Sequence, residues 1–418
     1  SMSWPCESEL GAMRRKVVEM CGRDWDEVRI AVSPYRICPI GAHIDHQGGT
    51  VSAMTINKGI LLGFVPSHDS QVVLESGQFE GQVKFRVDEE LVPGSSSFGW
   101  GSYAKGAIYA LHTRGNTLLK KGIVGFICGG EGLDSSGLSS SASVGVAYLL
   151  AFESANGVVA SPADNIEYDR VIENEYLGLN NGILDQSAIL LSTHGCLTSI
   201  NCKTKQHKLV RLSQQQQQQQ TKFKILLAFS GLKQALVTNP GYNARVAECR
   251  QAAKILFQAS GKEKTPLEDP LLSDVEPEIY EEHKHKLQPN LAKRAEHYFS
   301  ENKRVLKGLE AWAAGNLSDF GRLITASGSS SIRNYQSGCE PLIQLYEILL
   351  KAPGVYGARF SGAGFRGCCI AFVEPEHAVN AAAFVEEQYT KLQPNLAKQM
   401  HKEKMVLICD PGDCARLI

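Results

Sequence analysis

The sequence lacks the features that assign a chain to a membrane or to a nucleic acid. No apolar run reaches the roughly 20 residues that a membrane-spanning helix needs. The formal net charge is −1 over 418 residues, and no run of Lys or Arg is interleaved with aromatic residues. A general attraction to nucleic acid or to anionic lipid is therefore not expected. The pattern GxxxxGK[ST] is absent as well, which excludes a P-loop kinase.

Metal-binding cysteine patterns are also absent. The twelve cysteines are spread from Cys6 to Cys414, and none forms a Cys-x-x-Cys pair. Cys368 and Cys369 are adjacent, which is a poor geometry for a metal site or an ordinary disulfide. We therefore expect reduced thiols, a cytoplasmic location and no structural zinc.

The length and the apolar content of 43% are typical of a globular protein with two or three domains. A pure glutamine tract at 214–220 cannot pack into a core, so we expect a mobile surface loop there. We place the domain boundary after it, between 1–220 and 221–418. The octapeptide KLQPNLAK occurs at 286–293 and at 391–398, but two copies do not make a solenoid, and we assign it no function.

Hydrophobic periodicity and turn residues predict both helices and strands in each part of the chain. The expected strands are 28–32, 59–65 and 223–229; the expected helices are 103–112, 141–155, 165–178, 244–259, 280–315 and 340–351; and a strand–turn–strand unit is expected at 354–372.

A serine-rich segment runs into an almost uncharged helical stretch. Hydroxyls and unpaired N–H groups at a helix start, together with the helix dipole, suit phosphate oxygens and a metal ion. An ordinary serine cap on a buried helix explains the segment about equally well. The candidate residues for phosphate binding are Gly137, Leu138, Ser139, Ser140, Ser141 and Ala142.

A second segment, 34–49, places a cation, two histidines and a carboxylate among Gly and Pro directly after a strand. Arg36, His43, Asp45 and His46 there suit a polyhydroxylated ligand. The alternative is a surface loop whose side chains cap its own backbone. Metal ligation is the weaker interpretation, because two histidines and a carboxylate within four residues rarely converge on one ion.

Two further segments are less specific. Glu173 and Asp185 flank a Gly-containing turn and suit a metal ligand and a base, although two carboxylates in such a span are common by chance. A literal GxGxxG occurs at 362–367, but the residues after it predict a strand, whereas a dinucleotide-binding fold needs a helix there. We therefore expect a glycine hairpin close to a ligand or a neighbouring loop.

Taken in order, the four segments resemble the signature motifs of the galactokinase, homoserine kinase, mevalonate kinase and phosphomevalonate kinase (GHMP kinase) family. The similarity covers nearly the whole chain, from Val28 to about Val373. It implies an α+β, two-domain GHMP kinase fold with a ribosomal protein S5 domain 2-like N-terminal domain and a ferredoxin-like C-terminal domain. It further implies an active site in the interdomain cleft, with ATP and Mg²⁺.

The resemblance also implies individual roles. Asp185 matches the catalytic aspartate and Arg36 the arginine beside it, while Ser141 and Glu173 match the magnesium ligands. Such an aspartate holds or takes the proton of the attacking hydroxyl. Ser139 and Ser140 match the phosphate-binding loop of the family, and Trp100 and Tyr103 fall near its adenine pocket. The residues that match contacts near the sugar are His43, Asp45 and Tyr242.

Two departures from galactokinases bear on the substrate. Ala42 stands where galactokinases have a glutamate that contacts the sugar 6-hydroxyl. A uronic acid carries a carboxylate at that carbon, and two anions at ~4 Å repel by ~1 kcal/mol even in water. Arg366 stands where galactokinases have Gly, and it either binds the substrate carboxylate or an ATP phosphate, or faces solvent.

The replacement at position 42 resembles the plant members of the family that act on galacturonate. We therefore expect ATP-dependent phosphorylation of the C1 hydroxyl of D-galacturonate, in salvage of sugar acids. The alternatives are a sugar 1-kinase of broader specificity that also takes galactose or glucuronate, and a catalytically silent sugar sensor on the same fold. Decarboxylation of a phosphorylated mevalonate fits poorly with the polar loop around His43 and Asp45.

Overall fold

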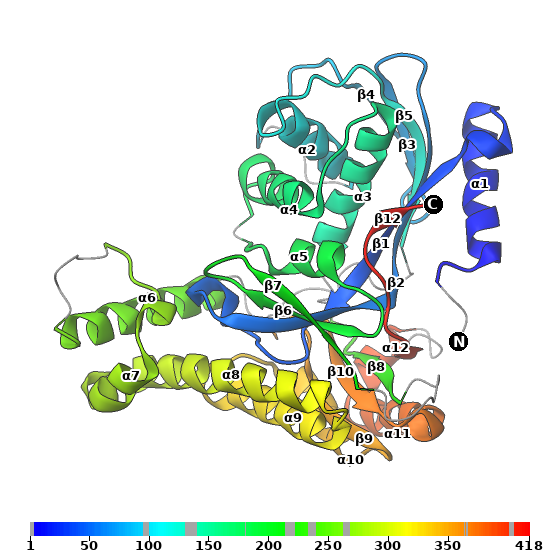
Figure 1. Ribbon diagram of the computed structural model, residues 1–418. Helices are drawn as coiled ribbons and strands as arrows, with labels where there is room; N and C mark the ends of the chain where they lie inside the picture. Colours follow the sequence, from blue (N-terminus) through cyan, green and yellow to red (C-terminus); the bar gives the residue numbers. More distant parts are fainter. Residues whose placement is uncertain are drawn as a thin grey trace.

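A computed structural model gives the architecture of the protein (Figure 1). It describes residues 4–94, 100–129, 140–179, 181–213, 222–232, 240–261, 268–362, 364, 367–400 and 405–418, without the side chains of Ser140 and Pro240. Two sheets with helices packed on them confirm the α+β class. Within these ranges no helix is both long and apolar enough to cross a membrane.

The first sheet has the order β12-β1-β2-β5-β3-β4, and β6 and β7 extend it from β2. Its pairs are antiparallel except β3 with β5. The 17-residue strand β2 pairs with β6 through residues 50–53, with β1 through residues 54–64 and with β5 through residues 61–66. The bounds are β1 (Arg29–Ile37), β2 (Thr50–Pro66), β3 (Gln71–Ser76), β4 (Gln82–Arg86), β5 (Ile123–Cys128), β6 (Cys196–Asn201), β7 (His207–Arg211) and β12 (Arg416–Leu417).

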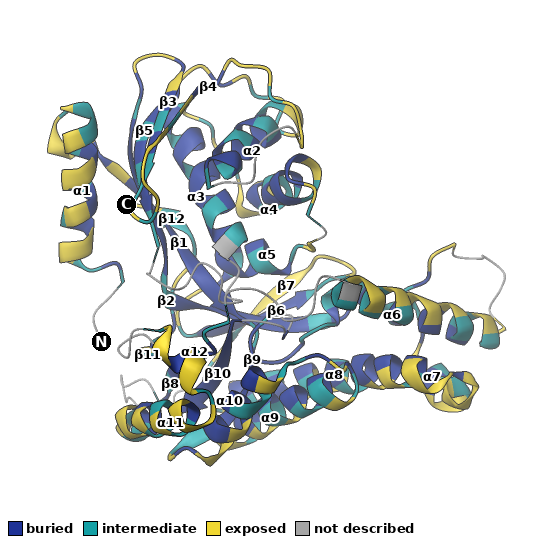
Figure 2. Ribbon diagram, turned by 180° about the vertical axis from the view of Figure 1, so that it is seen from behind, coloured by how far each residue is buried: buried dark blue, intermediate teal, exposed yellow. Residues whose placement is uncertain are grey.

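Helices cover both faces of this sheet. α2 (Trp100–Thr113), α3 (Ser140–Ala155) and α4 (Pro162–Arg170) lie on one face, and α1 (Glu7–Cys21) lies on the opposite one (Figure 1). α3 is the central helix: its apolar residues pack against α2 and against β1 and β2, and Figure 2 shows it as almost wholly buried. Glu153 is its one acidic or basic residue and most of its other residues are apolar or small, so the helix is stable only in such a position.

The second sheet is antiparallel, with the order β11-β8-β10-β9. Its strands are β8 (Lys224–Phe229), β9 (Val355–Phe360), β10 (Cys368–Val373) and β11 (Val406–Cys409). Its part of the chain contributes the helices α6 (Pro240–Ala259), α7 (Pro277–His283), α8 (Pro289–Ala313), α9 (Leu317–Arg333), α10 (Glu340–Lys351), α11 (Ala378–Leu392) and α12 (Pro394–Lys398). Since β10 follows the glycine motif, the prediction of a strand there is confirmed.

The remaining elements differ from the predicted ones in identifiable ways. The single helix expected at 280–315 is interrupted, because Pro289 starts α8 after a short 3-10 turn. The helix expected at 165–178 consists of the end of α4 and a π-helical segment, Val171–Tyr176. The helices α1, α5 (Leu184–Leu191), α9, α11 and α12 were not predicted. Short 3-10 turns occur at Trp25–Glu27, Asp45–Gln47, Leu272–Asp274, Lys284–Lys286 and Pro375–His377.

The repeated octapeptide has a local structural role. In both copies the Gln is the N-cap of a helix and the following Pro is its first residue, at Pro289 of α8 and at Pro394 of α12. Proline is favoured at this position because its missing N–H has no partner in a first turn anyway. The glutamine tract at 214–220 lies outside the described residues.

The first sheet is formed by the chain before residue 220 and the second by the chain after it, with one exception. All strands of the first sheet precede residue 220 except β12, whose Leu417 and Arg416 pair with β1. Helix α8 contacts β2, β6 and β7, and it also packs against α9, which covers β9. The boundary at residue 220 stays a prediction, but the end of the chain is clearly attached to the first sheet.

Candidate active site

The predicted catalytic pair is brought into direct contact. Nε of Arg36, near the end of β1, lies 2.7 Å from Oδ1 of Asp185. Asp185 is in the first turn of α5 (Leu184–Leu191). Its side chain is 28% exposed, whereas that of Arg36 is 9% exposed, so the carboxylate is the accessible member of the pair. Burial lowers the pKa of Arg36, but Asp185 outweighs this and the pKa is raised above its usual value.

A strand irregularity positions the arginine. The register of β1 against β2 shifts between Pro34 and Arg36, as in a β-bulge. Bulges re-aim the side chains that follow them and are frequent beside active sites. The Ser143 hydroxyl of α3 donates to the carbonyl of Pro34 at 2.8 Å. The bulge is therefore fastened to the helix that starts at the predicted phosphate loop.

The predicted metal ligands also lie together. Ser141, in the first turn of α3, is hydrogen-bonded to Tyr103 of α2 at 2.8 Å between the two hydroxyl oxygens. Glu173, in the π-helical segment, is 1% exposed and accepts from Asn181 at 3.2 Å, and the nearby Ser141 hydroxyl acts to lower its pKa. Burial and the charge of Asp185 raise its pKa.

Sequence reasoning missed a further carboxylate in this cluster. Asp169, near the end of α4, is fully buried and within hydrogen-bonding reach of Glu173. Burial, Glu173 and Asp185 raise its pKa well above the usual value. The sequence pattern could have indicated this residue, because Asp169 stands four residues before Glu173 in a predicted helix. That spacing puts both side chains on one helix face.

The predicted sugar loop lies beside the catalytic pair. A Cβ on Gly182, three residues before Asp185, would lie 3.3 Å from Oδ2 of Asp45. The His43 ring stacks on Tyr335, with ring centroids 4.2 Å apart. Burial lowers the pKa of His43 well below its usual value, so it is neutral at pH 7. Tyr335 follows α9, so both parts of the chain contribute to this region.

Two aromatic partners hold the second histidine of the loop. His46 Nε2 lies 3.1 Å from the Tyr335 hydroxyl oxygen. The His46 ring packs edge-on against the Tyr242 ring, with ring centroids 6.3 Å apart. Burial raises the pKa of Tyr242, with smaller contributions from the charges of Asp45 and Asp185. Tyr242, a predicted sugar contact, is therefore close enough to the catalytic pair for the charge of Asp185 to act on its pKa.

Helix α8 anchors the loop at position 42. The N–H groups of Gly41 and Ala42 donate to Oε2 of Glu301 at 3.0 and 3.1 Å. His297 Nε2 donates to the Ala42 carbonyl at 2.8 Å, and its Nδ1 lies 2.9 Å from the Ser330 hydroxyl. The backbone of Ala42 is thus fixed on both sides by residues four apart on one helix. Sequence reasoning missed both, although their spacing places them on one face.

Glu301 is a buried charge with compensating partners. It is 0% exposed and accepts from Arg304 Nε at 2.6 Å, from the Ser327 hydroxyl, and, at 3.8 Å, faces Arg359. Burial raises the pKa of Glu301, but the neighbouring positive charges outweigh it and the pKa is lowered. The carboxylate therefore stays ionised and keeps accepting from the loop.

Several predicted residues are placed only in part. Gly137, Leu138, Ser139 and Arg366 lie outside the described residues, and Ser140 is described only as the first residue of α3. Ala142 is buried inside α3. Trp100 starts α2, one turn before Tyr103, and both pack against the main apolar core.

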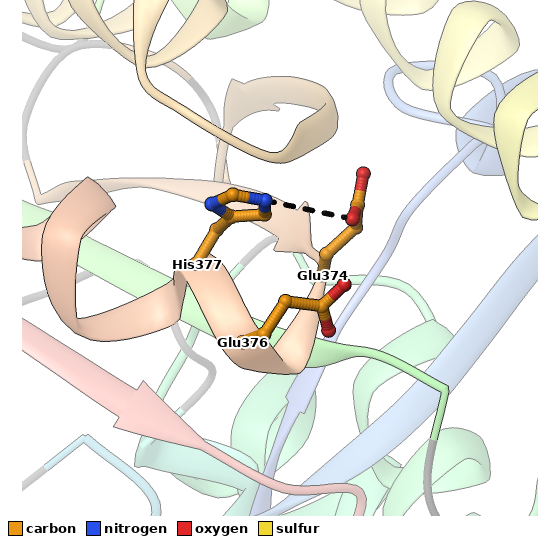
Figure 3. A group of neighbouring side chains, drawn as sticks. All are labelled: Glu374, Glu376 and His377. Atoms are coloured by element: carbon orange, nitrogen blue, oxygen red, sulfur yellow. Dashed lines mark ion pairs between the residues drawn. The ribbon is translucent and has the colours of Figure 1, made fainter.

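One other group has the composition of a metal site. Glu374, Glu376 and His377 bring their ligand atoms within 4.8 Å of one another at the turn before α11 (Figure 3). His377 Nε2 lies 3.8 Å from Glu374 Oε2, and both side chains are about 40% exposed, at 43% and 38%. An i,i+3 ion pair on a surface turn accounts for this geometry, so we assign no ion to it. The twelve cysteines form no disulfide bond, and their reduced state stays a prediction.

Comparisons with known proteins agree with this arrangement. Residues 102–193 match the model for the N-terminal domain of GHMP kinases, and residues 306–391 match that for the C-terminal domain. The chain is 62% identical to the galacturonokinase of Arabidopsis thaliana, over all of both chains. It is 32% identical to the galactokinase of Lactobacillus helveticus, over 83% of this chain and 86% of the relative.

Solved structures show the same fold. The crystal structure of Lactococcus lactis galactokinase complexed with galactose superposes with a TM-score of 0.83 at 29% identity, covering 98% of this chain and 99% of that one. A mevalonate kinase superposes with a TM-score of 0.61 at 17% identity, covering 92% of this chain and 99% of the other. The predicted fold is confirmed by these matches.

Proposed function

The chain belongs to the GHMP kinase family, and we propose that it phosphorylates the C1 hydroxyl of D-galacturonate with ATP. The observation that carries the proposal is the 62% identity to Arabidopsis galacturonokinase over the whole of both chains. The contact between Arg36 and Asp185 supports a retained phosphotransfer site. We further propose that the two domains are 1–220 and 221–418 and that, since the twelve cysteines form no disulfide bond, the protein works in the cytoplasm.

In the proposed reaction, Asp185 accepts the proton of the C1 hydroxyl. The hydroxyl oxygen forms a bond to the γ-phosphorus, the bond to the bridging oxygen of ATP breaks, and ADP leaves. Arg36 holds the Asp185 carboxylate in place through their contact and offsets negative charge as the phosphoryl group is transferred. Asp185 is more accessible than Arg36, as a group that meets a substrate has to be.

The residues present fit a magnesium ion bound beside ATP. Ser141 and Glu173 offer the hydroxyl and carboxylate oxygens that this hard cation prefers. Oε2 of Glu173 is buried and has no hydrogen-bond partner among the described residues. When bound, the ion would neutralise charge on the phosphates. The proposed nucleotide contacts are the phosphate-loop residues 137–142, with Trp100 and Tyr103 near the adenine.

The proposed preference for a sugar acid rests on position 42. Ala42 offers no carboxylate where galactokinases have one, and the contacts to Glu301 and His297 hold its backbone in place. A sugar carboxylate would therefore meet no anion from this residue. His43, Asp45 and Tyr242 are the proposed contacts to the remaining hydroxyls, and Arg366 is a proposed partner of the sugar carboxylate or of ATP.

The test is an ADP-release assay with Mg-ATP and galacturonate, glucuronate or galactose, run side by side. We expect kcat/KM for galacturonate to exceed that for the other two sugars at least tenfold. Comparable values for all three would establish the broader sugar kinase instead. Release of no ADP from any sugar, with nucleotide binding intact, would contradict the proposal and favour a sugar sensor.

A further inference from the structure

We infer that Asp169 is a second carboxylate of the cation site, acting there together with Glu173. The inference rests on the proposed function only in that a kinase of this kind uses a divalent cation beside ATP. It concerns a residue to which no role was assigned from the motifs, because Asp169 precedes the segment that resembles the family signature.

The first observation is an excess of acceptors in a buried place. Asp169 is 0% exposed and Glu173 is 1% exposed, and the two carboxyl groups are within hydrogen-bonding reach. No donor among the described residues reaches either Oδ atom of Asp169 or Oε2 of Glu173. Ionised carboxylates have only acceptor atoms, so a proton or a cation has to lie between them. Buried unpartnered oxygens are costly unless something fills that position.

The second observation is that two helices present these groups in matched pairs. Ser141 and Gly145 are four residues apart on α3, and Asp169 and Glu173 are four residues apart across the end of α4. Ser141 lies near enough to Glu173 to act on its pKa, and Gly145 lies against Asp169. Both carboxylates therefore face the helix whose N-terminal turn follows the predicted phosphate loop.

Gly145 provides the space for the Asp169 carboxylate. A Cβ at position 145 would fall well inside van der Waals distance of Oδ1 of Asp169. Glycine in a helix interior is less stabilising than alanine. Its presence in the middle of α3 is explained if the carboxylate has to lie at this point.

A shared proton is the competing explanation, and it predicts a different result. If Asp169 is protonated and only donates a hydrogen bond to Glu173, an asparagine amide can replace it as the donor. The variant Asp169→Asn would then bind cations as the wild type does and would be more stable without them. If Asp169 faces the cation, the same variant loses a negatively charged oxygen ligand and binds the cation more weakly.

The experiment measures Mn²⁺ binding by electron paramagnetic resonance, with a non-hydrolysable ATP analogue and no sugar. For Asp169→Asn we expect the Mn²⁺ dissociation constant to rise at least tenfold, a typical loss for the immediate surroundings of a metal. Glu175→Gln is the matched control: it removes a carboxylate from the same segment that is 44% exposed and lies 3.8 Å from Arg170. We expect this control to bind Mn²⁺ as the wild type does.

A second variant tests the position of the carboxylate without removing it. Gly145→Ala forces Asp169 to move, so Mn²⁺ binding should weaken here too, and the double variant with Asp169→Asn should lose no more than the larger single effect. Gly11→Ala, in α1, adds a methyl group without a close contact and serves as its control. Unchanged Mn²⁺ affinity in Asp169→Asn would overturn the inference.

The binding experiment can fail or succeed independently of whether the proposed function is correct. Mn²⁺ and the nucleotide analogue are the only probes, so the binding measurement is valid whichever sugar is phosphorylated. A wild-type protein that binds Mn²⁺ and nucleotide but releases no ADP with any sugar would contradict the function alone.

Discussion

Arg36 Nε and Asp185 Oδ1 are 2.7 Å apart, although 149 positions separate the two residues in the chain. The contact joins the bulge of β1 to the first turn of α5. Two parts of the fold that contact α3 are therefore linked through one ion pair at the proposed catalytic centre. The carboxylate of this pair is the group on which turnover should depend most.

Asp185→Asn tests this dependence. We expect kcat to fall by about 10²–10⁴, the usual contribution of a positioned acid–base group, because an amide cannot accept the C1 proton. Binding of an ATP analogue, measured by calorimetry, should change little. Asp88→Asn removes an exposed carboxylate paired with Arg86 and should leave both quantities unchanged. An unchanged kcat in Asp185→Asn would remove this residue from the mechanism.

Ala42→Glu tests the basis of substrate choice. We expect kcat/KM for galacturonate to fall at least tenfold more than kcat/KM for galactose, because the new carboxylate repels that of the sugar acid. The matched control is Ala42→Gln, which has nearly the same volume and no charge. Equal losses for the two sugars in Ala42→Glu would mean that the effect is steric.

Glu301→Gln tests the anchoring of the loop at position 42. An amide oxygen accepts more weakly from the N–H groups of Gly41 and Ala42, and the buried Arg359 loses a counter-charge. We expect a higher KM for the sugar and a loss of about 3–5 kcal/mol in the free energy of unfolding, as when a buried ion pair is broken. KM for ATP should change less.

The control for this variant is Glu310→Gln, an exposed position on the same helix. Urea unfolding and steady-state kinetics on both variants separate the two effects. If Glu301→Gln loses stability while KM for the sugar stays unchanged, the contact holds the fold but does not position the loop.

Much of the fold was predictable because local patterns and tertiary packing agree. The stretch that forms α10 was predicted with its observed bounds, since its apolar periodicity matches its buried face. Helix α9 was missed: its Ser- and Gly-rich sequence has low helix propensity. Small residues are nevertheless required there, because a Cβ on Gly321 would clash with the main chain of Tyr356. Contacts with β9 therefore outweigh local preference in this helix.

The site was predictable only where a motif carries its residues. Arg36 and Asp185 belong to two such segments, and the structure brings them into contact. Glu301 and Asp169 belong to none, and each acquires its partners only through packing of distant elements. A single acidic residue in a helix usually lies on the surface, so nothing local marks either as buried.

A buried glutamate outside the site gives a prediction for stability against pH. Glu153 of α3 is 5% exposed, and its Oε1 accepts from Asn165 at 3.0 Å. Oε2 has no partner among the described residues. Burial raises the pKa of Glu153 from 4.5 to about 7. Between these values the unfolded chain loses this proton while the folded protein keeps it, so the carboxyl group destabilises the fold increasingly as the pH rises.

Glu153→Gln removes this titration and keeps the side-chain size. We expect the variant to gain stability relative to the wild type, with a gain about 2 kcal/mol larger at pH 8 than at pH 5. Urea unfolding at the two pH values measures the difference. Glu347→Gln, at an exposed position of α10, is the control and should show no pH-dependent gain. An equal gain at both pH values would mean that Glu153 titrates as it does in the unfolded chain, and that its burial has no electrostatic cost.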